Sequence, residues 1–100
     1  MRYHDVDIPE DRIAEFCSRH GIARLSLFGS ILTHDFRVDS DVDVLVEFHP
    51  GRTPGMFKFA GMAMELSGII GRPVDLKMPG DLSKYFRDYV ERTARVQYAA

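Results

Sequence analysis

The stretch Asp39-Ser40-Asp41-Val42-Asp43-Val44-Leu45-Val46-Glu47-Phe48 predicts a buried strand with a pair of carboxylates at its start. Residues two apart in a strand share a face, so the side chains of Asp41 and Asp43 should lie side by side, and the valines of the stretch should face the core. Two neighbouring carboxylates repel each other unless a cation compensates them, and Mg²⁺ is the usual partner. The stretch therefore predicts a strand over residues 41–48 and a metal site at its beginning.

Gly29-Ser30 precedes Asp41 by ten intervening residues and predicts a phosphate-binding turn. Residues 23–28 alternate apolar and polar side chains as a short strand does, so a helical turn starting near Ser30 would expose unpaired N–H groups that bind anions. Gly29 permits a sharp turn and close approach of backbone to phosphate, and the Ser30 hydroxyl adds a donor. Because Mg²⁺ takes up phosphate oxygens of a substrate, the two motifs together predict a metal-dependent site for a nucleoside triphosphate.

The combination of these two motifs resembles the polymerase-β-like nucleotidyltransferase superfamily. Residues 39–48 and the later stretch Gly71-Arg72-Pro73-Val74-Asp75-Leu76 are similar to its smallest branch, the MNT proteins, which are minimal nucleotidyltransferases often paired with HEPN toxins. The resemblance extends from about Ala23 to Tyr98.

This resemblance implies roles for particular residues. Asp75 matches a carboxylate that the family carries on a later strand, where Val74 and Leu76 would point into the core. Asp41, Asp43 and Asp75 would be the catalytic residues and would together hold two Mg²⁺ ions, with Asp75 also able to act as a base.

One position departs from the family pattern. The family usually carries an arginine three residues after the serine, and this chain has Thr33 there. The loss of a forked cation should weaken phosphate binding or the stabilisation of charge in the transition state. Arg37, which fits the family pattern, is expected to supply some of that charge. The expected nucleotide-binding residues are therefore Gly29, Ser30 and Arg37.

The reaction implied by the resemblance is a Mg²⁺-dependent transfer of AMP from ATP to a tyrosine hydroxyl of a partner HEPN toxin, for which the chain would be the antitoxin. A second interpretation is an inactive antitoxin-like subunit that masks its partner by contact alone. A third is a small-molecule nucleotidyltransferase of the aminoglycoside type, disfavoured because the chain lacks a second lobe to enclose such a substrate. The expected assembly is a homo-oligomer or a hetero-oligomer with the toxin, and the sequence does not decide between them.

Composition narrows the class of protein. The 100 residues are expected to form a single domain, residues 1–100, large enough for one core. A net charge of −2 without a long Lys/Arg block argues against strong binding of nucleic acid. No apolar stretch reaches the roughly 20 residues of a membrane helix, and the N-terminus lacks the apolar core of a signal peptide. The single cysteine, Cys17, is expected in the core of a cytoplasmic protein.

The order of predicted elements indicates an α/β (α+β) fold, a small mixed β-sheet of the polymerase-β nucleotidyltransferase type flanked by about four helices. The first expected element is a helix that begins at Asp7 and Pro9 and ends at Gly21. It is followed by a strand over residues 23–28, a short helix from Ser30 and a strand over residues 41–48. A long helix from the loop 50–55 to about Ser67, a strand over residues 74–78 and a final helix capped by Asp81 complete the order. The four histidines, His4, His20, His34 and His49, have no zinc-ligand spacing and are interpreted as surface or loop residues.

Overall fold

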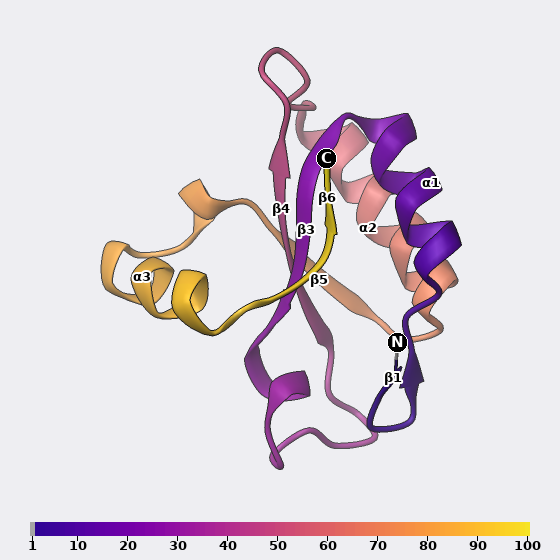
Figure 1. Ribbon diagram of the computed structural model, residues 1–100, viewed down its shortest axis with the longest axis vertical. Coiled ribbons are helices and arrows are strands. Elements are labelled where there is room, and N and C mark those ends of the chain that lie inside the picture. The colour runs from indigo at the N-terminus through magenta and orange to yellow at the C-terminus, as the bar shows by residue number, and fades with distance from the viewer. Residues whose placement is uncertain (1) are drawn as a thin grey trace.

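A computed structural model describes residues 2–100, which fold around a four-stranded sheet in the order β5-β4-β3-β6 (Figure 1). The strands are β3 (Ile22–Phe28), β4 (Val42–Phe48), β5 (Val74–Lys77) and β6 (Arg95–Ala99). Strand β3 pairs antiparallel with β4 and β6, whereas β4 and β5 run parallel. The predicted mixed sheet and α/β class are confirmed.

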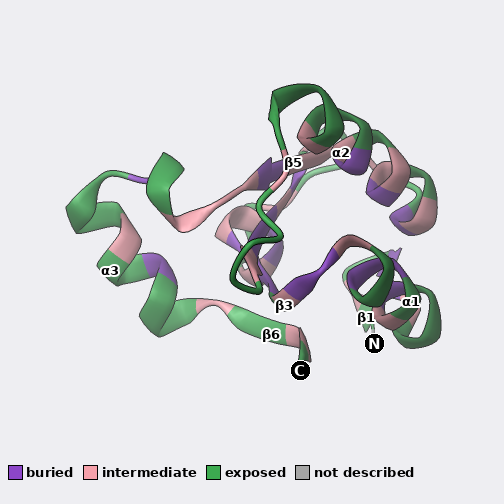
Figure 2. Ribbon diagram, turned by 90° about the horizontal axis from the view of Figure 1, so that it is seen from above, coloured by how far each residue is buried: buried purple, intermediate pink, exposed green. Residues whose placement is uncertain are grey.

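The helices divide between the two faces of this sheet. Helices α1 (Glu10–His20) and α2 (Met56–Ile70) lie together on one face, and α3 (Lys84–Thr93) stands off the other side (Figure 2). Helix α2 also carries the chain from β4 to its parallel neighbour β5, which requires such a crossover.

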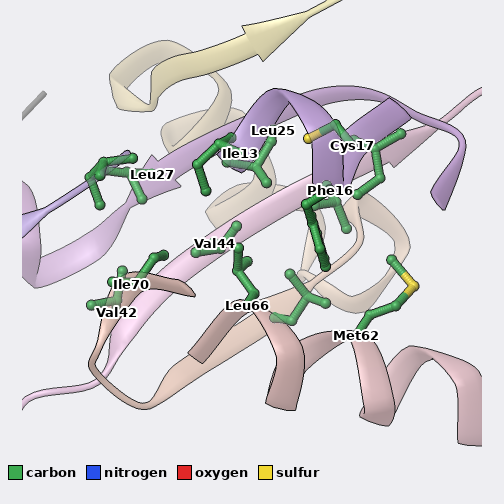
Figure 3. Packing of buried hydrophobic residues seen from close by; sticks show 14 of the residues in the cluster. Ile13, Phe16, Cys17, Leu25, Leu27, Val42, Val44, Met62, Leu66 and Ile70 are labelled. Atoms are coloured by element: carbon green, nitrogen blue, oxygen red, sulfur yellow. The ribbon is translucent and has the colours of Figure 1, made fainter. Parts of the chain in front are cut away.

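The main core lies between the sheet and the helix pair α1 and α2. The valines of β4 that alternate with the acidic residues are fully buried, as their period of two predicts. They pack with side chains of both helices, among them Phe16 of α1 and Leu66 of α2 (Figure 3). Cys17 belongs to this cluster, and burial raises the pKa of its thiol to about 12, so the cysteine is an inert core residue as expected.

Both long helices end at a glycine in the left-handed conformation. Helix α1 follows Pro9 and ends at Gly21, with φ of 72°. Helix α2 continues beyond the predicted end at Ser67 and stops at Gly71, with φ of 81°. Ser67 lies within the helix, where its hydroxyl donates to the carbonyl of Ala63 and accepts the N–H of Val74.

The short helix expected from Ser30 is confirmed as a 3₁₀ helix, η1 (Gly29–Leu32), whereas the predicted cap of the final helix is wrong. Asp81 does not cap α3, because its carboxylate accepts the N–H of Met78 at 3.0 Å and closes the 3₁₀ helix η2 (Pro79–Asp81). The cap of α3 is Ser83, whose hydroxyl accepts the N–H of Phe86. The hairpin of β1 (Arg2–Tyr3) and β2 (Val6–Asp7) and the strand β6 are additional to the predicted elements.

The interpretation of His20 as a surface residue is also wrong. It is the last residue of α1, its side chain is only 12% exposed, and its ring packs against Phe16. Its Nε2 lies 3.0 Å from a carboxylate oxygen of Glu65 on α2, so it joins the two helices.

Candidate active site

The register of β4 against β5 brings two of the expected carboxylates together. Asp43 and Asp75 are direct partners in the parallel ladder, so they occupy equivalent positions on neighbouring strands. Both lie on the face of the sheet away from the main core, because their neighbours Val42 and Val44 are buried on the core side. Asp41 directly precedes β4 and is exposed. The expected strands thus lie side by side.

The electrostatics of Asp43 reflect this arrangement. Burial raises the pKa of the Asp43 carboxyl, and the nearby carboxylates of Asp75 and Asp41 raise it further, while Lys77 acts in the opposite direction. Burial and the two neighbouring carboxylates thus disfavour the negative charge of Asp43, which a bound cation would stabilise. A set of carboxylates without histidine or cysteine suits a hard ion such as Mg²⁺ better than zinc.

The side chains are not arranged as a complete metal site. Among residues 2–100, no three His, Cys, Asp or Glu side chains are placed so that they could hold an ion together. Asp75 pairs instead with Lys77, whose Nζ lies 3.6 Å from its Oδ1. Binding of a metal by all three carboxylates would therefore require a change of side-chain rotamer at this strand.

Gly29 is packed directly against Asp43. It follows Phe28, which is the partner of Asp43 in the antiparallel ladder, and it has a φ of 78°. A Cβ atom at this position would lie 2.2 Å from Oδ2 of Asp43, far inside the van der Waals distance. Only glycine fits here, so the turn that starts η1 is held against the carboxylate. Ser30 follows it and is half-buried.

Thr33 has a structural role in the same turn. Its hydroxyl donates to the carbonyl of Ser30 at 2.9 Å and accepts the N–H of Asp35 at 3.1 Å. The position that carries arginine in the family therefore closes η1 in this chain. Arg37 lies further along the loop with an exposed side chain, and it does not line the cavity that borders Gly29.

Two residues near the site were missed by the sequence analysis. Arg72 organises the loop that leads to Asp41, because it donates to the carbonyls of Arg37 and Ser40 and stacks on the ring of Phe36 at 4.7 Å. Lys77 shares a face of β5 with Asp75, and their spacing of two residues in a predicted strand was the available signal. The contacts of Arg72 could not be predicted from a local pattern, because they join residues more than 30 positions apart along the chain.

The carboxylate pair on adjacent strands and the glycine turn packed against it form the arrangement that the resemblance to the nucleotidyltransferases led us to expect. The chain belongs to the minimal nucleotidyltransferases, since residues 10–98 match the family described as "Nucleotidyltransferase domain". It is 35% identical over 68 residues to the protein adenylyltransferase MntA of Thermococcus cleftensis, which covers 68% of this chain and 67% of that protein.

Solved structures show the same fold. A protein assigned as a minimal nucleotidyltransferase is 35% identical, with a TM-score of 0.70 and coverage of 85% of both chains. A toxin–antitoxin complex with AMP-PNP gives a TM-score of 0.74 at 19% identity, covering 93% of this chain and 75% of the other. The complex of a tri-AMPylated Shewanella oneidensis HEPN toxin with its MNT antitoxin gives 0.66 at 18% identity, covering 91% and 70%.

Proposed function

We propose that this chain is an antitoxin that transfers AMP from ATP, with Mg²⁺, to a tyrosine hydroxyl of a HEPN-type toxin. The observation that carries the proposal is the direct pairing of Asp43 with Asp75, with Gly29 packed against Asp43. The acceptor class is supported by the relatives, which include a protein adenylyltransferase and an MNT antitoxin in complex with an AMPylated HEPN toxin.

In this proposal each residue has a defined task. Asp41 and Asp43 would hold one Mg²⁺ ion, and Asp43 and Asp75 would hold a second, so that the ions would supply positive charge to the triphosphate and to the attacking hydroxyl. Gly29 and Ser30 present backbone N–H groups and a hydroxyl to the outer phosphates, and Arg37 adds charge from the loop. The bound ions would neutralise phosphate charge and orient the reacting groups.

The chemical step exchanges the phosphoanhydride bond between the α- and β-phosphates of ATP for a phosphodiester bond to the tyrosine oxygen. The tyrosine oxygen bonds to the α-phosphorus of ATP, and the bond from that phosphorus to the bridging oxygen of the β-phosphate breaks. Pyrophosphate leaves with the electron pair, and the hydroxyl proton passes to the carboxylate of Asp75. In the structure Lys77 lies beside this carboxylate, with its Nζ 3.6 Å from Oδ1, so Asp75 must change rotamer to reach the reacting groups.

The proposal also covers the assembly and the cellular location of the protein. Residues 1–100 act as one catalytic domain, either as a complex with the toxin or as a homo-oligomer. We place the protein in the cytoplasm, which the buried free thiol of Cys17 supports. Within residues 2–100, no helix is both long and apolar enough to cross a membrane.

One observation favours a second function. Thr33 uses its hydroxyl within η1 and offers no charge to a phosphate, so an antitoxin that only masks its partner by contact is the competing reading of the same fold.

The experiment that separates the two functions uses Asp41→Asn/Asp43→Asn. This variant keeps size and hydrogen bonding but removes the charge that recruits Mg²⁺. The wild-type protein, incubated with toxin, ATP and Mg²⁺, should add the mass of AMP to the toxin, and the variant should lose at least about a thousandfold in rate with its fold intact. Intact-mass spectrometry provides the measurement. Unmodified toxin together with equal protection by both proteins would establish the masking function instead.

A further inference from the structure

The side of helix α2 that faces away from the sheet is exposed (Figure 2) and apolar. Four exposed positions lie opposite its buried residues, at spacings of four, three and four: Phe57, Gly61, Met64 and Gly68. Phe57 is 94% exposed and Met64 is 77% exposed. A surface helix ordinarily carries polar side chains on its outer side, and a helix that is apolar all round is ordinarily buried. The outer face of α2, formed by these four residues, therefore has the character of an interface.

The two glycines leave hollows beside the two large side chains of this face. A Cβ atom at Gly61 or Gly68 would have no atom of residues 2–100 within 4 Å, apart from the adjoining backbone of α2. Gly68 also borders a hollow of about 470 Å³ whose walls come from α1 and α2. Large and small positions thus alternate along the face, so a second helix with the matching alternation can approach closely and place its side chains in the hollows.

This alternation matches itself when a second copy of α2 runs antiparallel to the first. With a two-fold axis midway between Gly61 and Met64, these two residues face each other across the contact. The same axis brings Phe57 of one copy opposite Gly68 of the other. Each large side chain then meets a glycine. A parallel pair in register would instead place Phe57 against Phe57 and would leave the glycine hollows empty.

The charges beside the outer face are complementary in the same antiparallel arrangement. Glu65 lies on the flank of α2 next to α1, where it binds Arg19, and Lys58 lies two turns earlier on that flank. The two-fold axis keeps this flank on one side and reverses its direction, so Lys58 of one copy comes beside Glu65 of the other. The hollow there is lined by three carboxylates, including Asp11 and Glu15, and by two guanidinium groups. Its acidic excess favours the incoming lysine and fixes the direction of the pair.

We propose that the outer face of α2 binds a second copy of this chain, as an antiparallel helix pair with two-fold symmetry. The proposal selects the homo-oligomer from the assemblies named in the proposed function, and it stands independently of the transfer reaction. Asp43 and Asp75 lie on the opposite face of the sheet, so both sites of the dimer stay open and point away from the contact.

The dimer should be weak, because a single helix pair is a small interface. At a chain concentration of about 1 µM it should dissociate, and substitutions on the outer face of α2 should then leave the stability of the monomer nearly unchanged. At higher concentration, association should become measurable.

The first test measures association of the chain alone by sedimentation equilibrium. Phe57→Glu/Met64→Glu places two like charges on the outer face of each copy. Val38→Glu/Tyr85→Glu is the matched control, because it makes the same replacements at exposed apolar residues outside α2. All four side chains are at least 77% exposed, so both variants should fold, which circular dichroism checks.

The dissociation constant of the dimer should rise by at least about tenfold in Phe57→Glu/Met64→Glu and by less than about twofold in the control. A wild-type chain that stays monomeric at about 1 mM would overturn the proposal. So would equal weakening in both variants, or a dimer that the α2 variant leaves intact. If the wild-type chain is monomeric and only the α2 variant loses binding to the toxin, the toxin is the occupant of this face and the proposal is wrong.

The second test determines the direction of the helices by disulfide cross-linking. Chains carrying Phe57→Cys are mixed with chains carrying Gly68→Cys and oxidised, while the native Cys17 is buried and does not compete. The mixed disulfide should form, because positions 57 and 68 face each other, whereas position 57 lies about 16 Å along the axis from its own counterpart. The absence of a mixed disulfide, or a preference for joining two Phe57→Cys chains, would overturn the antiparallel arrangement.

These outcomes are distinguishable from failure of the proposed function, because neither measurement contains ATP. If the wild-type chain dimerises as expected but transfers no AMP, the transferase proposal fails and the dimer stands. If transfer depends on the carboxylates while the wild-type chain stays monomeric, only the dimer proposal fails.

Discussion

The two faces of the sheet differ in what they contribute, although the same strands make both. On the face covered by α1 and α2, apolar side chains of β3 and β4 are buried and stabilise the fold. On the other face, β4 and β5 place Asp43 beside Asp75, and burial of Asp43 opposes its charge. The main core therefore lies on one face and the proposed site on the other, where Phe28, Leu45, Leu82 and Val90 form a smaller apolar cluster. Substitutions in the main core should chiefly change stability, and substitutions of the carboxylates should chiefly change the proposed activity.

The largest effect should come from the core face. Leu66→Ala removes a fully buried side chain of α2 and leaves a cavity against the sheet, which should lower the free energy of unfolding by about 3 kcal/mol. Met64→Ala on the same helix removes a side chain that is 77% exposed and should cost less than about 0.5 kcal/mol. Urea denaturation measures both. Similar costs for the two variants would contradict the assignment of the core to this face.

In the turn after β3, Thr33→Arg should tighten ATP binding by about 1.5–3 kcal/mol, the range for a charge-assisted hydrogen bond. Thr33 directly follows η1, so the new guanidinium group would lie close to the turn proposed to bind phosphate. Calorimetric titration of ATP with Mg²⁺ tests this, with Thr33→Gln as a control that lacks the charge. The absence of any gain would mean that other groups already supply the charge.

A comparison of two glycines sharpens the role of the turn. Gly29→Ala and Gly51→Ala both place alanine at a φ of 78°, but only at position 29 would the new Cβ meet another side chain. Both variants should therefore carry a similar backbone strain of about 1 kcal/mol or more. Gly29→Ala should cost about 1–2 kcal/mol beyond Gly51→Ala and should also reduce transfer, because Asp43 must move. Thermal unfolding and the transfer assay test the difference, which would vanish if Asp43 could move away freely.

The smallest effect concerns pH. Because the pKa of Asp43 is raised in the folded state, its ionisation is less favourable there than in the unfolded chain, so it removes stability as pH rises through the folded pKa. Asp43→Asn should therefore gain stability relative to wild type between about pH 4 and pH 7, by less than about 1 kcal/mol, and Mg²⁺ should reduce this gain. Thermal melts across this range provide the measurement. A gain that shrinks as pH rises would contradict the stated sign.

The predictable parts of the fold are those whose signal is local. The alternation in residues 41–48 predicts β4 and the burial of its valines, and the glycines at the ends of α1 and α2 give helix stops to within a few residues. The class of enzyme was predicted from the carboxylate and glycine motifs through their resemblance to a family. The match of residues 10–98 to the nucleotidyltransferase domain family confirms that prediction.

The parts that could not be predicted depend on contacts between distant residues. Strand β6 is recognisable only through its pairing with β3, about 70 residues earlier in the chain. The same holds for the burial of His20 against Glu65 and for the cavity that Arg2 shares with Arg95. At Asp81 the signal was local, but two caps competed, and the carboxylate closes the turn at Met78 while Ser83 begins the helix.

Strand β5 has only four residues and forms one edge of the sheet. Its register with β4 therefore depends on few hydrogen bonds, among them the bond from the N–H of Val42 to the carbonyl of Pro73. Such a strand can open locally without global unfolding. Its amide protons should accordingly exchange with deuterium faster than those of β3 and β4. Asp75 would then join and leave the proposed site on the timescale of that opening, and bound nucleotide and metal should slow the exchange.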